Sequence, residues 1–236
     1  DVLSSRGLGD VYKRQVLTGV DISDYGSDFE HRYSMSNLIL DILDKTKLQR
    51  LRLSSIDCVE IDEQFDEVLK DQRVMPHLHL SIQSGDDMIL KRMKRRHNSK
   101  DVFEFVEHCK KIREDVSFGA DIIAGFPTET DEMFDNTYRL LKENEISHLH
   151  IFPFSPKNNT PASRMPQVSK LIIKKRAKNL RELGELILKK VKSKLSLPRE
   201  VLIEELNLGL AVGYDQNYIK HKVPLVGVPV GEIVRI

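Results

Sequence analysis

Two turns of the chain have the residues and the position of a ligand site, because each follows an apolar strand and contains glycine and polar groups. Residues 77–85 read HLHLSIQSG, and residues 119–129 read GADIIAGFPTE. In barrels and open sheets of parallel strands, ligands bind beyond the carboxyl ends of the strands. The two turns therefore predict a cofactor site at one edge of a parallel sheet.

Two pairs of histidines have the spacing of barrel metal ligands, His77 with His79 and His148 with His150. A metal-dependent barrel hydrolase is therefore one alternative function. Both pairs fall in the early half of their strands, toward the face of a barrel that contributes stability, whereas ligands belong at the later ends. We expect hydrogen-bonded interior or flanking histidines and no metal site.

The chain has only two cysteines, Cys58 and Cys109, and they are far apart. This usage excludes a disulfide framework and is typical of a reducing compartment. Their spacing fits no metal motif, so we interpret both as buried small residues. No long apolar run or secretory signal is visible, which predicts a cytoplasmic protein without a membrane segment.

Short strands and amphipathic helices alternate along most of the 236 residues. Repeated alternation of this kind predicts parallel strands joined by right-handed crossovers. Plausible N-caps support the helices, at Ser34 or Ser36, Asp62, Ser99 and Thr130. The expected strands are 16–20, 49–54, 77–83, 117–124 and 148–152, and the expected helices are 35–46, 61–71, 87–95, 99–114 and 130–144.

The strands have one apolar face and one polar face, which distinguishes between two α/β architectures. In the third strand Leu78, Leu80 and Ile82 alternate with His77, His79, Ser81 and Gln83. A doubly wound sheet covered by helices on both sides would be apolar on both faces. The polar face instead predicts an incomplete barrel that surrounds a polar ligand, with five strands in this chain.

The first fifteen residues have no periodicity that continues into the rest of the chain. They resemble the translated adapter sequence found at the ends of assembled fragments, and we exclude residues 1–15 from the predicted fold. We expect the natural chain to continue upstream of Val16. The predicted barrel then spans residues 16–168.

A basic helix and a small β module follow the predicted barrel. Residues 170–199 contain eleven lysines and arginines against two glutamates, although the whole chain has a net charge of only +1. This run predicts either a solvated helix face or a surface for a polyanion, and the run 91–96 (KRMKRR) favours the polyanion. We expect a connecting helix within 169–196 and short strands with glycine turns in 197–236.

Several ordered motifs resemble the radical S-adenosylmethionine methylthiotransferases. The resemblance runs from about Val16 to the C-terminus, and residues 17–22 with the pair Tyr25-Gly26 are most similar to the MtaB branch, which modifies N6-threonylcarbamoyladenosine beside the tRNA anticodon. The motifs are VLTGVDISDYG (16–26), RLRLSS (50–55), LSIQSGDDMILKRMKR (80–95), DIIAGFPTET (121–130) and FPFSPKNNTPA (152–162).

The resemblance implies an α/β fold, a partial six-stranded radical S-adenosylmethionine barrel with five strands present, followed by a TRAM-like RNA-binding module at 197–236. In that family, a loop with the pattern Cys-x-x-x-Cys-x-x-Cys after the first strand holds a [4Fe-4S] cluster. This loop and the N-terminal domain with a second cluster are absent from the sequence. The resemblance therefore also implies an inactive fragment.

The resemblance further implies which residues contact S-adenosylmethionine and RNA. The strand ends would hold the amino group, carboxylate and ribose of the cofactor, Gly125 would allow close approach of the adenine, and Arg92 or Arg95 would pair with the carboxylate. RNA would be bound by stacking and phosphate pairing. The cofactor residues are Gly19, Asp21, Ser54, Ser55, Gln83, Ser84, Gly85, Arg95, Ile123, Gly125, Phe126 and Pro127, and the RNA residues are Lys174, Lys175, Arg176, Tyr214, Tyr218, Lys220 and Lys222.

The implied reaction adds a methylthio group to C2 of the adenine in threonylcarbamoyladenosine, after a deoxyadenosyl radical abstracts the hydrogen there. The implied partners are tRNA, S-adenosylmethionine and an external electron donor, and we expect a monomer. Two alternatives remain besides the hydrolase. One is a sister methylthiotransferase that acts on isopentenyladenosine in tRNA or on a ribosomal-protein aspartate, and the other is a non-catalytic RNA-binding protein.

Overall fold

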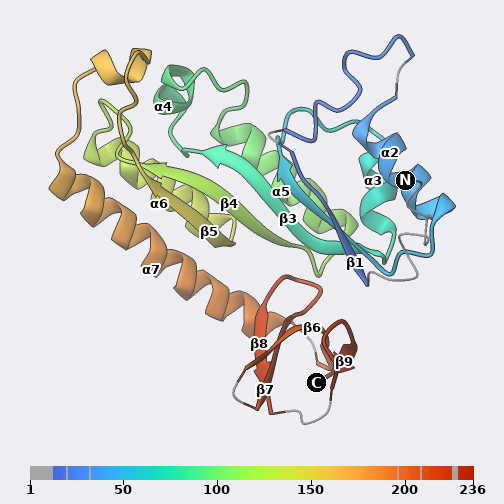
Figure 1. Ribbon diagram of the computed structural model, residues 1–236. Helices are drawn as coiled ribbons and strands as arrows, with labels where there is room; N and C mark the ends of the chain where they lie inside the picture. Colours follow the sequence, from blue (N-terminus) through green and yellow to red (C-terminus); the bar gives the residue numbers. More distant parts are fainter. Residues whose placement is uncertain (1–12, 20, 32, 196, 208, 225–227) are drawn as a thin grey trace.

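The computed structural model has two sheets, a parallel sheet with its helices and a smaller antiparallel sheet at the C-terminus (Figure 1). It describes residues 13–19, 21–31, 33–195, 197–207, 209–224 and 228–236. Most of the segment 1–15, which we predicted to lie outside the fold, is therefore outside the described residues.

Five parallel strands form the first sheet in the order in which they occur along the chain. This order confirms the predicted α/β architecture, because each strand pairs in parallel with the next strand along the chain. The strands are β1 (Arg14–Leu17), β2 (Arg50–Ile56), β3 (Val74–Gln83), β4 (Ser117–Ala124) and β5 (Ile146–Pro153).

The first strand differs from the prediction at both ends. It begins at Arg14, which pairs with Arg50 in β2, and it ends at Leu17, three residues before the expected end. The boundary predicted at residue 16 is therefore corrected by two residues. Backbone hydrogen bonds to β2 extend the strand toward the N-terminus, and such bonds do not depend on the periodicity of the side chains.

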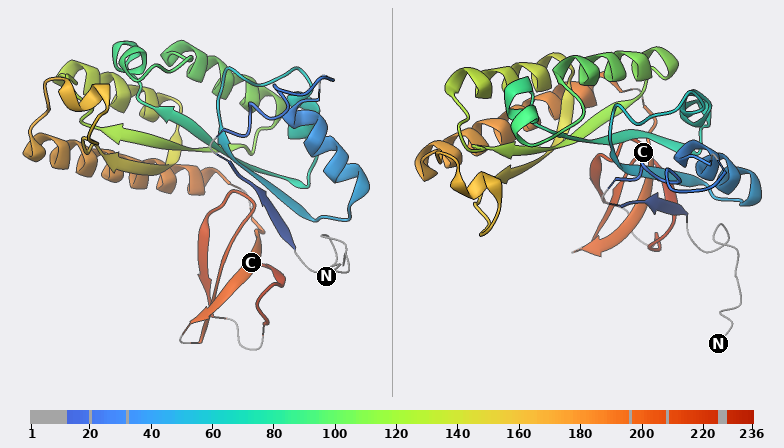
Figure 2. Two further views of the ribbon diagram at one scale, coloured as in Figure 1. Left: turned by 45° about the horizontal axis from the view of Figure 1, so that its top comes forward. Right: turned by 90° about the horizontal axis from the view of Figure 1, so that it is seen from above.

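Helices α2, α3, α5 and α6 cover one face of the parallel sheet (Figure 2), and α4 lies beyond the end of β3 (Figure 1). Ser34 and Thr130 cap α2 and α6 as predicted, whereas Asn98 rather than Ser99 caps α5. Helix α3 begins later than expected because Asp62 accepts a turn hydrogen bond from Gln64 and does not cap the helix. The bounds are α2 (Met35–Lys45), α3 (Phe65–Lys70), α4 (Asp87–Arg92), α5 (Ser99–Ile112) and α6 (Asp131–Glu143).

The main core lies between this sheet and its helices. Leu78, Leu80 and Ile82 of β3 are almost completely buried in it, together with Phe65 and Phe118. The opposite face of the sheet carries the polar residues of the alternation, as the sequence predicts. This face is the interior of the partial barrel.

Helix α7 (Lys170–Lys194) follows the barrel and packs along β5, with Ile173, Leu180 and Ile187 among its buried residues. The strand order of the C-terminal sheet is β8, β7, β6, β9, and all its pairs are antiparallel. Its curled form fits the predicted small barrel. The strands are β6 (Glu200–Asn207), β7 (Leu210–Tyr214), β8 (Lys220–Val223) and β9 (Ile233–Arg235).

The C-terminal sheet is docked at the amino ends of the parallel strands (Figure 1). The Asn217 amide nitrogen lies 3.0 Å from the Pro76 carbonyl oxygen and 2.6 Å from that of Asp115. The Arg50 guanidinium lies 3.4 Å from the Glu200 carboxylate. These contacts hold the module away from the carboxyl edge of the parallel sheet.

Candidate functional site

The loop after β1 is fixed to the carboxyl end of β2. The Ile22 amide lies 3.5 Å from the Ser55 carbonyl oxygen, and the Asp21 carboxylate accepts from the Ser23 amide at 3.1 Å. Gly19 is exposed and Asp21 is half-buried. Two of the predicted site residues therefore lie at the expected edge of the sheet.

The Asp21 carboxylate faces a cation that the sequence analysis did not assign to the site. Its Oδ2 lies 3.6 Å from Arg96 Nη2, and Arg96 Nη1 also pairs with Glu60. Burial and a hydrogen bond with Asp21 together raise the pKa of Glu60 to about 7. Arg96 is therefore the cation that contacts the Asp21 carboxylate, while the predicted pairing of Arg92 or Arg95 with a cofactor carboxylate stays a prediction.

Ser54, Ser55 and Gln83 stand at the ends of neighbouring strands with half-buried side chains. Ser55 has a φ of 62° and Gln83 a φ of 67°, in the left-handed region. Non-glycine residues held in that region cost energy and are concentrated at ligand sites. The structure thus brings these three predicted neutral groups to the same edge.

Ser84 and Gly85 belong to the interior rather than to an open site. The Gly85 amide donates to the Thr137 hydroxyl at 2.9 Å, and Ser84 Oγ lies 3.3 Å from the same hydroxyl. A Cβ at position 85 would lie 2.7 Å from the Thr137 Cα. The prediction that these two residues contact cofactor is therefore corrected, because they attach α6 to the end of β3.

The turn at Gly125, Phe126 and Pro127 packs against other parts of the chain. Gly125 has a φ of 75°, and a Cβ there would lie 2.4 Å from Ile173 Cγ1 in α7. Phe126 is buried, with its ring centroid 5.4 Å from that of Phe154. The side of Gly125 on which a Cβ would lie is therefore packed against α7, and the approach of an adenine to this turn stays a prediction.

A buried ion pair closes the same turn. The Arg176 guanidinium lies 2.7 Å from the Glu129 carboxylate and 2.7 Å from that of Asp131. Burial raises the pKa of Glu129, and Arg176 opposes this rise. Arg176 is only 4% exposed, so its predicted contact with RNA is corrected to a structural role.

A group of titratable residues crosses the polar face of three strands. The Asp121 carboxylate lies 2.9 Å from His79 Nε2 and 3.2 Å from His150 Nδ1. The hydrogen bond from His79 lowers the pKa of Asp121 against the effect of burial. Ile123 follows Asp121 on this face and is half-buried. This group could hold a proton or orient a polar ligand in the barrel interior.

The amino end of the interior is closed by a loop of the C-terminal module. The Tyr218 ring lies 3.8 Å from the Arg52 guanidinium carbon and stacks on His77 at 5.7 Å between centroids. His77 lies 3.1 Å from Ser117 Oγ, and His148 lies 3.1 Å from the Tyr218 carbonyl oxygen. These contacts confirm that both predicted histidine pairs consist of hydrogen-bonded residues.

The predicted RNA residues divide into exposed and packed groups. Lys174 and Lys175 on α7 and Lys220 and Lys222 on β8 are exposed. Tyr214 and Tyr218 stack on each other at 4.6 Å, and Tyr218 also packs against the barrel. The four lysines are accessible, whereas Tyr218 primarily closes the barrel.

A polar cavity of about 850 Å³ lies at the opposite end from the strand-end residues, between the parallel sheet, α7 and the C-terminal module. Its lining mixes cations such as Arg50 and Lys194 with anions such as Glu114 and Glu200. A mixed lining of this kind has no preference for a polyanion. We assign the candidate site to the carboxyl edge instead.

The two thiols do not fit an iron–sulfur cluster. Cys109 is fully buried in the main core on α5, and Cys58 follows β2. Burial raises the pKa of each thiol to about 12. Because a cluster needs several thiolates close together, no step of cluster chemistry is assigned to these cysteines.

Residues 11–141 match the family described as the radical SAM superfamily. The chain belongs to this superfamily of enzymes. The match includes the barrel strands β1 to β4 and the carboxyl edge described above, so the strand-end residues belong to the family's cofactor-binding fold. The predicted radical S-adenosylmethionine architecture is thereby confirmed.

Curated relatives carry methylthiotransferase names. The chain is 48% identical over 219 residues to the "threonylcarbamoyladenosine tRNA methylthiotransferase MtaB" of Rickettsia prowazekii. This alignment covers 90% of this chain and 50% of the relative. It is 34% identical over 234 residues to the "tRNA-2-methylthio-N(6)-dimethylallyladenosine synthase" of Bacillus subtilis, covering 95% of this chain and 45% of the relative. The chain spans about half the length of these curated relatives.

A solved structure shares the fold. The coproporphyrinogen III oxidase HemN from Escherichia coli, a radical SAM enzyme, aligns with a TM-score of 0.51 over 78% of this chain and 49% of that chain, at 15% identity. This likeness supports the fold class and no particular activity.

Sequence reasoning missed Asp57, Glu60, Arg96 and His97 at the same edge. Asp57 follows β2, and His97 lies between α4 and α5, where its Nε2 hydrogen bonds to the Ile82 carbonyl oxygen at 3.0 Å. The signal that could have found them is their position just after the polar strand ends.

No helix among the described residues has the length and apolarity needed to cross a bilayer.

Proposed function

We propose that this chain is the cofactor-binding barrel and RNA-binding tail of a tRNA methylthiotransferase that adds a methylthio group to C2 of threonylcarbamoyladenosine. The similarity to the Rickettsia prowazekii relative, 48% identity over 90% of the chain, carries the proposal. The MtaB relatives of Rickettsia prowazekii and Thermotoga maritima are 48% and 39% identical, against 34% for the B. subtilis dimethylallyladenosine synthase, which favours threonylcarbamoyladenosine over the isopentenyl substrate.

In this proposal the carboxyl edge binds S-adenosylmethionine. Ser54, Ser55 and Gln83 are half-buried neutral groups that suit a ribose or carboxylate, and Asp21 suits an ammonium. When bound, S-adenosylmethionine supplies the radical chemistry for which the superfamily is named. The role of this chain's residues is to bind and orient the cofactor, while His79, Asp121 and His150 provide polar groups on the interior face.

The proposal also assigns tRNA to the basic surface of α7 and β8. The exposed lysines are Lys174, Lys175, Lys220 and Lys222. Exposed lysines bind phosphates with an affinity that depends on the salt concentration. The proposed partners are tRNA, S-adenosylmethionine and an external electron donor. The proposed setting is a cytoplasmic monomer with [4Fe-4S] clusters held by residues outside this chain.

Titration of the purified chain with S-adenosylmethionine and with tRNA tests the binding half of the proposal. We expect S-adenosylmethionine binding that weakens when Gln83 is replaced by Ala, and an unchanged affinity when exposed Lys100 is replaced by Ala. tRNA should bind with an affinity that falls as salt rises. Equal binding of S-adenosylmethionine by the Gln83→Ala variant would contradict the assignment of the carboxyl edge.

A further inference from the structure

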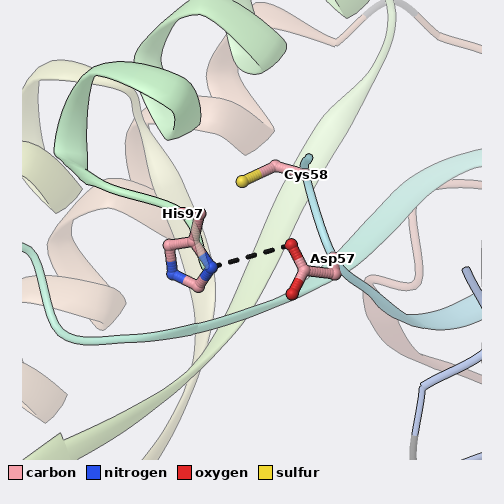
Figure 3. Close-up of side chains that lie close together, drawn as sticks. All are labelled: Asp57, Cys58 and His97. Carbon is pink, nitrogen blue, oxygen red and sulfur yellow. Dashed lines mark ion pairs between the residues drawn. The ribbon is translucent and has the colours of Figure 1, made fainter. Parts of the chain in front are cut away.

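Three side chains at the carboxyl edge form a group beside the proposed cofactor contacts, because the Asp57 carboxylate also lies within 4.8 Å of the Asp21 and Glu60 carboxylates. Asp57 and Cys58 follow β2 directly, and His97 lies in the turn between α4 and α5 (Figure 3). One oxygen, one sulfur and one nitrogen from these residues lie within 4.8 Å of one another. Oxygen, thiolate and imidazole together make a donor set that zinc accepts.

His97 is held in the orientation of a metal ligand. Its Nε2 lies 3.0 Å from the Ile82 carbonyl oxygen, and because a carbonyl can only accept, Nε2 carries a proton. In the neutral ring, Nδ1 then carries a lone pair that can bind a metal. A ligating histidine typically donates its other N–H to a carbonyl or carboxylate in this way.

The Nδ1 atom of His97 has no hydrogen-bond partner among the described residues, although the side chain is only 1% exposed. It faces the Asp57 Oδ1 at 3.6 Å, which is too long for a hydrogen bond. Two ligands of a tetrahedral zinc, each bonded at about 2.0–2.1 Å, are separated by about 3.3–3.5 Å. The observed distance is close to this separation.

Hydrogen bonds at both ends of the residue fix Asp57. The Asp57 amide donates to Ser23 Oγ at 2.9 Å, and its Oδ1 accepts from the Val59 amide at 3.2 Å. The site therefore contains one fixed carboxylate beside an unpartnered imidazole nitrogen.

We propose that Asp57, Cys58 and His97 bind a zinc ion at the carboxyl edge of the sheet, with a fourth position open to water. On binding, the Cys58 thiol releases its proton to solvent and the sulfur bonds to zinc as a thiolate. The ion joins the end of β2 to the turn before α5. This inference does not depend on the proposed methylthiotransferase function.

Titration of the purified chain with Co²⁺ as a spectroscopic probe tests the site. We expect one Co²⁺ per chain, a thiolate-to-cobalt charge-transfer band in the near ultraviolet, intense tetrahedral ligand-field bands, and displacement by Zn²⁺. Replacement of Cys58 by Ala should remove the charge-transfer band and weaken Zn²⁺ binding by about tenfold or more. His97→Asn should also weaken binding, while Cys109→Ala is the matched thiol control and should bind like the parent.

Two results would overturn the proposal. One is the absence of a charge-transfer band from the parent chain at saturating Co²⁺. The other is equal Zn²⁺ affinity of the parent and the Cys58→Ala variant. Thermal melting of each variant without metal shows whether it is folded, and the spectrum of the parent chain decides the question even if a variant is not.

Discussion

Arg176 shows how one buried charge holds the turn after β4. It is 4% exposed and contacts the carboxylates of Glu129 and Asp131, each at 2.7 Å. Glu129 also accepts from the Gly125 amide at 3.0 Å, so the pair attaches α7 to the Gly-Phe-Pro turn. Loss of the guanidinium would leave the buried Glu129 carboxylate without a counterion.

Replacement of Arg176 by Met should therefore lower the free energy of unfolding by about 3–5 kcal/mol, the usual cost of breaking a buried pair. Urea denaturation measures this change. Lys175→Met on the same helix is the control, because Lys175 is exposed and its loss should change stability by less than about 0.5 kcal/mol. Similar decreases in the free energy of unfolding for the two variants would contradict a structural role for Arg176.

His148 predicts a pH dependence of stability. Burial lowers its pKa from 6.5 to about 4 in the folded chain, although the Tyr218 carbonyl opposes this shift. The unfolded chain therefore binds more protons between these values, and stability falls as the pH decreases from about 6.5 to 4. The contribution is about 3 kcal/mol at most.

Denaturation midpoints of the parent and of His148→Gln between pH 7 and pH 4 measure this contribution. The variant should lose less stability over the interval, because glutamine does not titrate. His77 has a lowered pKa from burial and acts in the same direction, so some dependence should remain. An identical pH profile for both chains would show that His148 does not contribute.

At the scale of elements, the loop between β7 and β8 couples the C-terminal sheet to the barrel. The Asn217 side-chain nitrogen lies within 3.3 Å of two backbone carbonyls and of Ser117 Oγ. The neighbouring Asp215 carboxylate lies 2.9 Å from Arg199 and 2.8 Å from His221. The loop is therefore built to face the amino ends of β3 and β4.

Replacement of Asn217 by Ala should cost about 1–3 kcal/mol, because buried carbonyl groups lose their donor. It should also make the segment near residue 197 more sensitive to limited proteolysis. Asn207→Ala is the matched control, since Asn207 is exposed at the end of β6. Unchanged proteolysis and stability in the Asn217 variant would contradict the docking.

The elements were largely predictable from the sequence, because strands and helices follow short-range periodicity and capping. Ser34 and Thr130 were identified as caps, whereas Asn98 was missed because Ser99 beside it is an equally good cap residue. The polar face of β3 was also predictable from alternation. The early start of β1 was not predictable in this way, because it depends on pairing with a partner strand.

The site was less predictable, because its details depend on contacts distant in sequence. Gly125 was assigned to an adenine, and its close packing against Ile173, 48 positions later in the chain, could not be derived from the motif. Arg176 belongs to a basic run, and only its partner Glu129 shows that it is buried. Sequence order alone does not show which member of a charged stripe faces inward.

At the scale of the whole molecule, the basic residues of α7 predict how tRNA would bind. Lys174 and Lys175 are exposed near the start of the helix. A variant with both replaced by Glu should bind tRNA more weakly and with a smaller salt dependence, because each phosphate contact contributes about one unit to the slope. Fluorescence anisotropy at several salt concentrations measures both quantities.

The control for this prediction is the pair Lys45→Glu and Lys70→Glu. Both lysines are exposed but lie on α2 and α3, away from α7. This control variant should retain tRNA affinity despite the same change in net charge. Equal weakening in the two double variants would indicate a general charge effect rather than a surface on α7.

The central claim is that the protein to which this chain belongs installs a methylthio group on threonylcarbamoyladenosine. The most direct measurement is mass spectrometry of tRNA nucleosides from a bacterium that lacks this modification, before and after it receives the complete gene that encodes this chain. The account predicts that 2-methylthio-N6-threonylcarbamoyladenosine appears with the gene. Its absence, with the protein present and folded, or a methylthio group on isopentenyladenosine instead, would contradict the account.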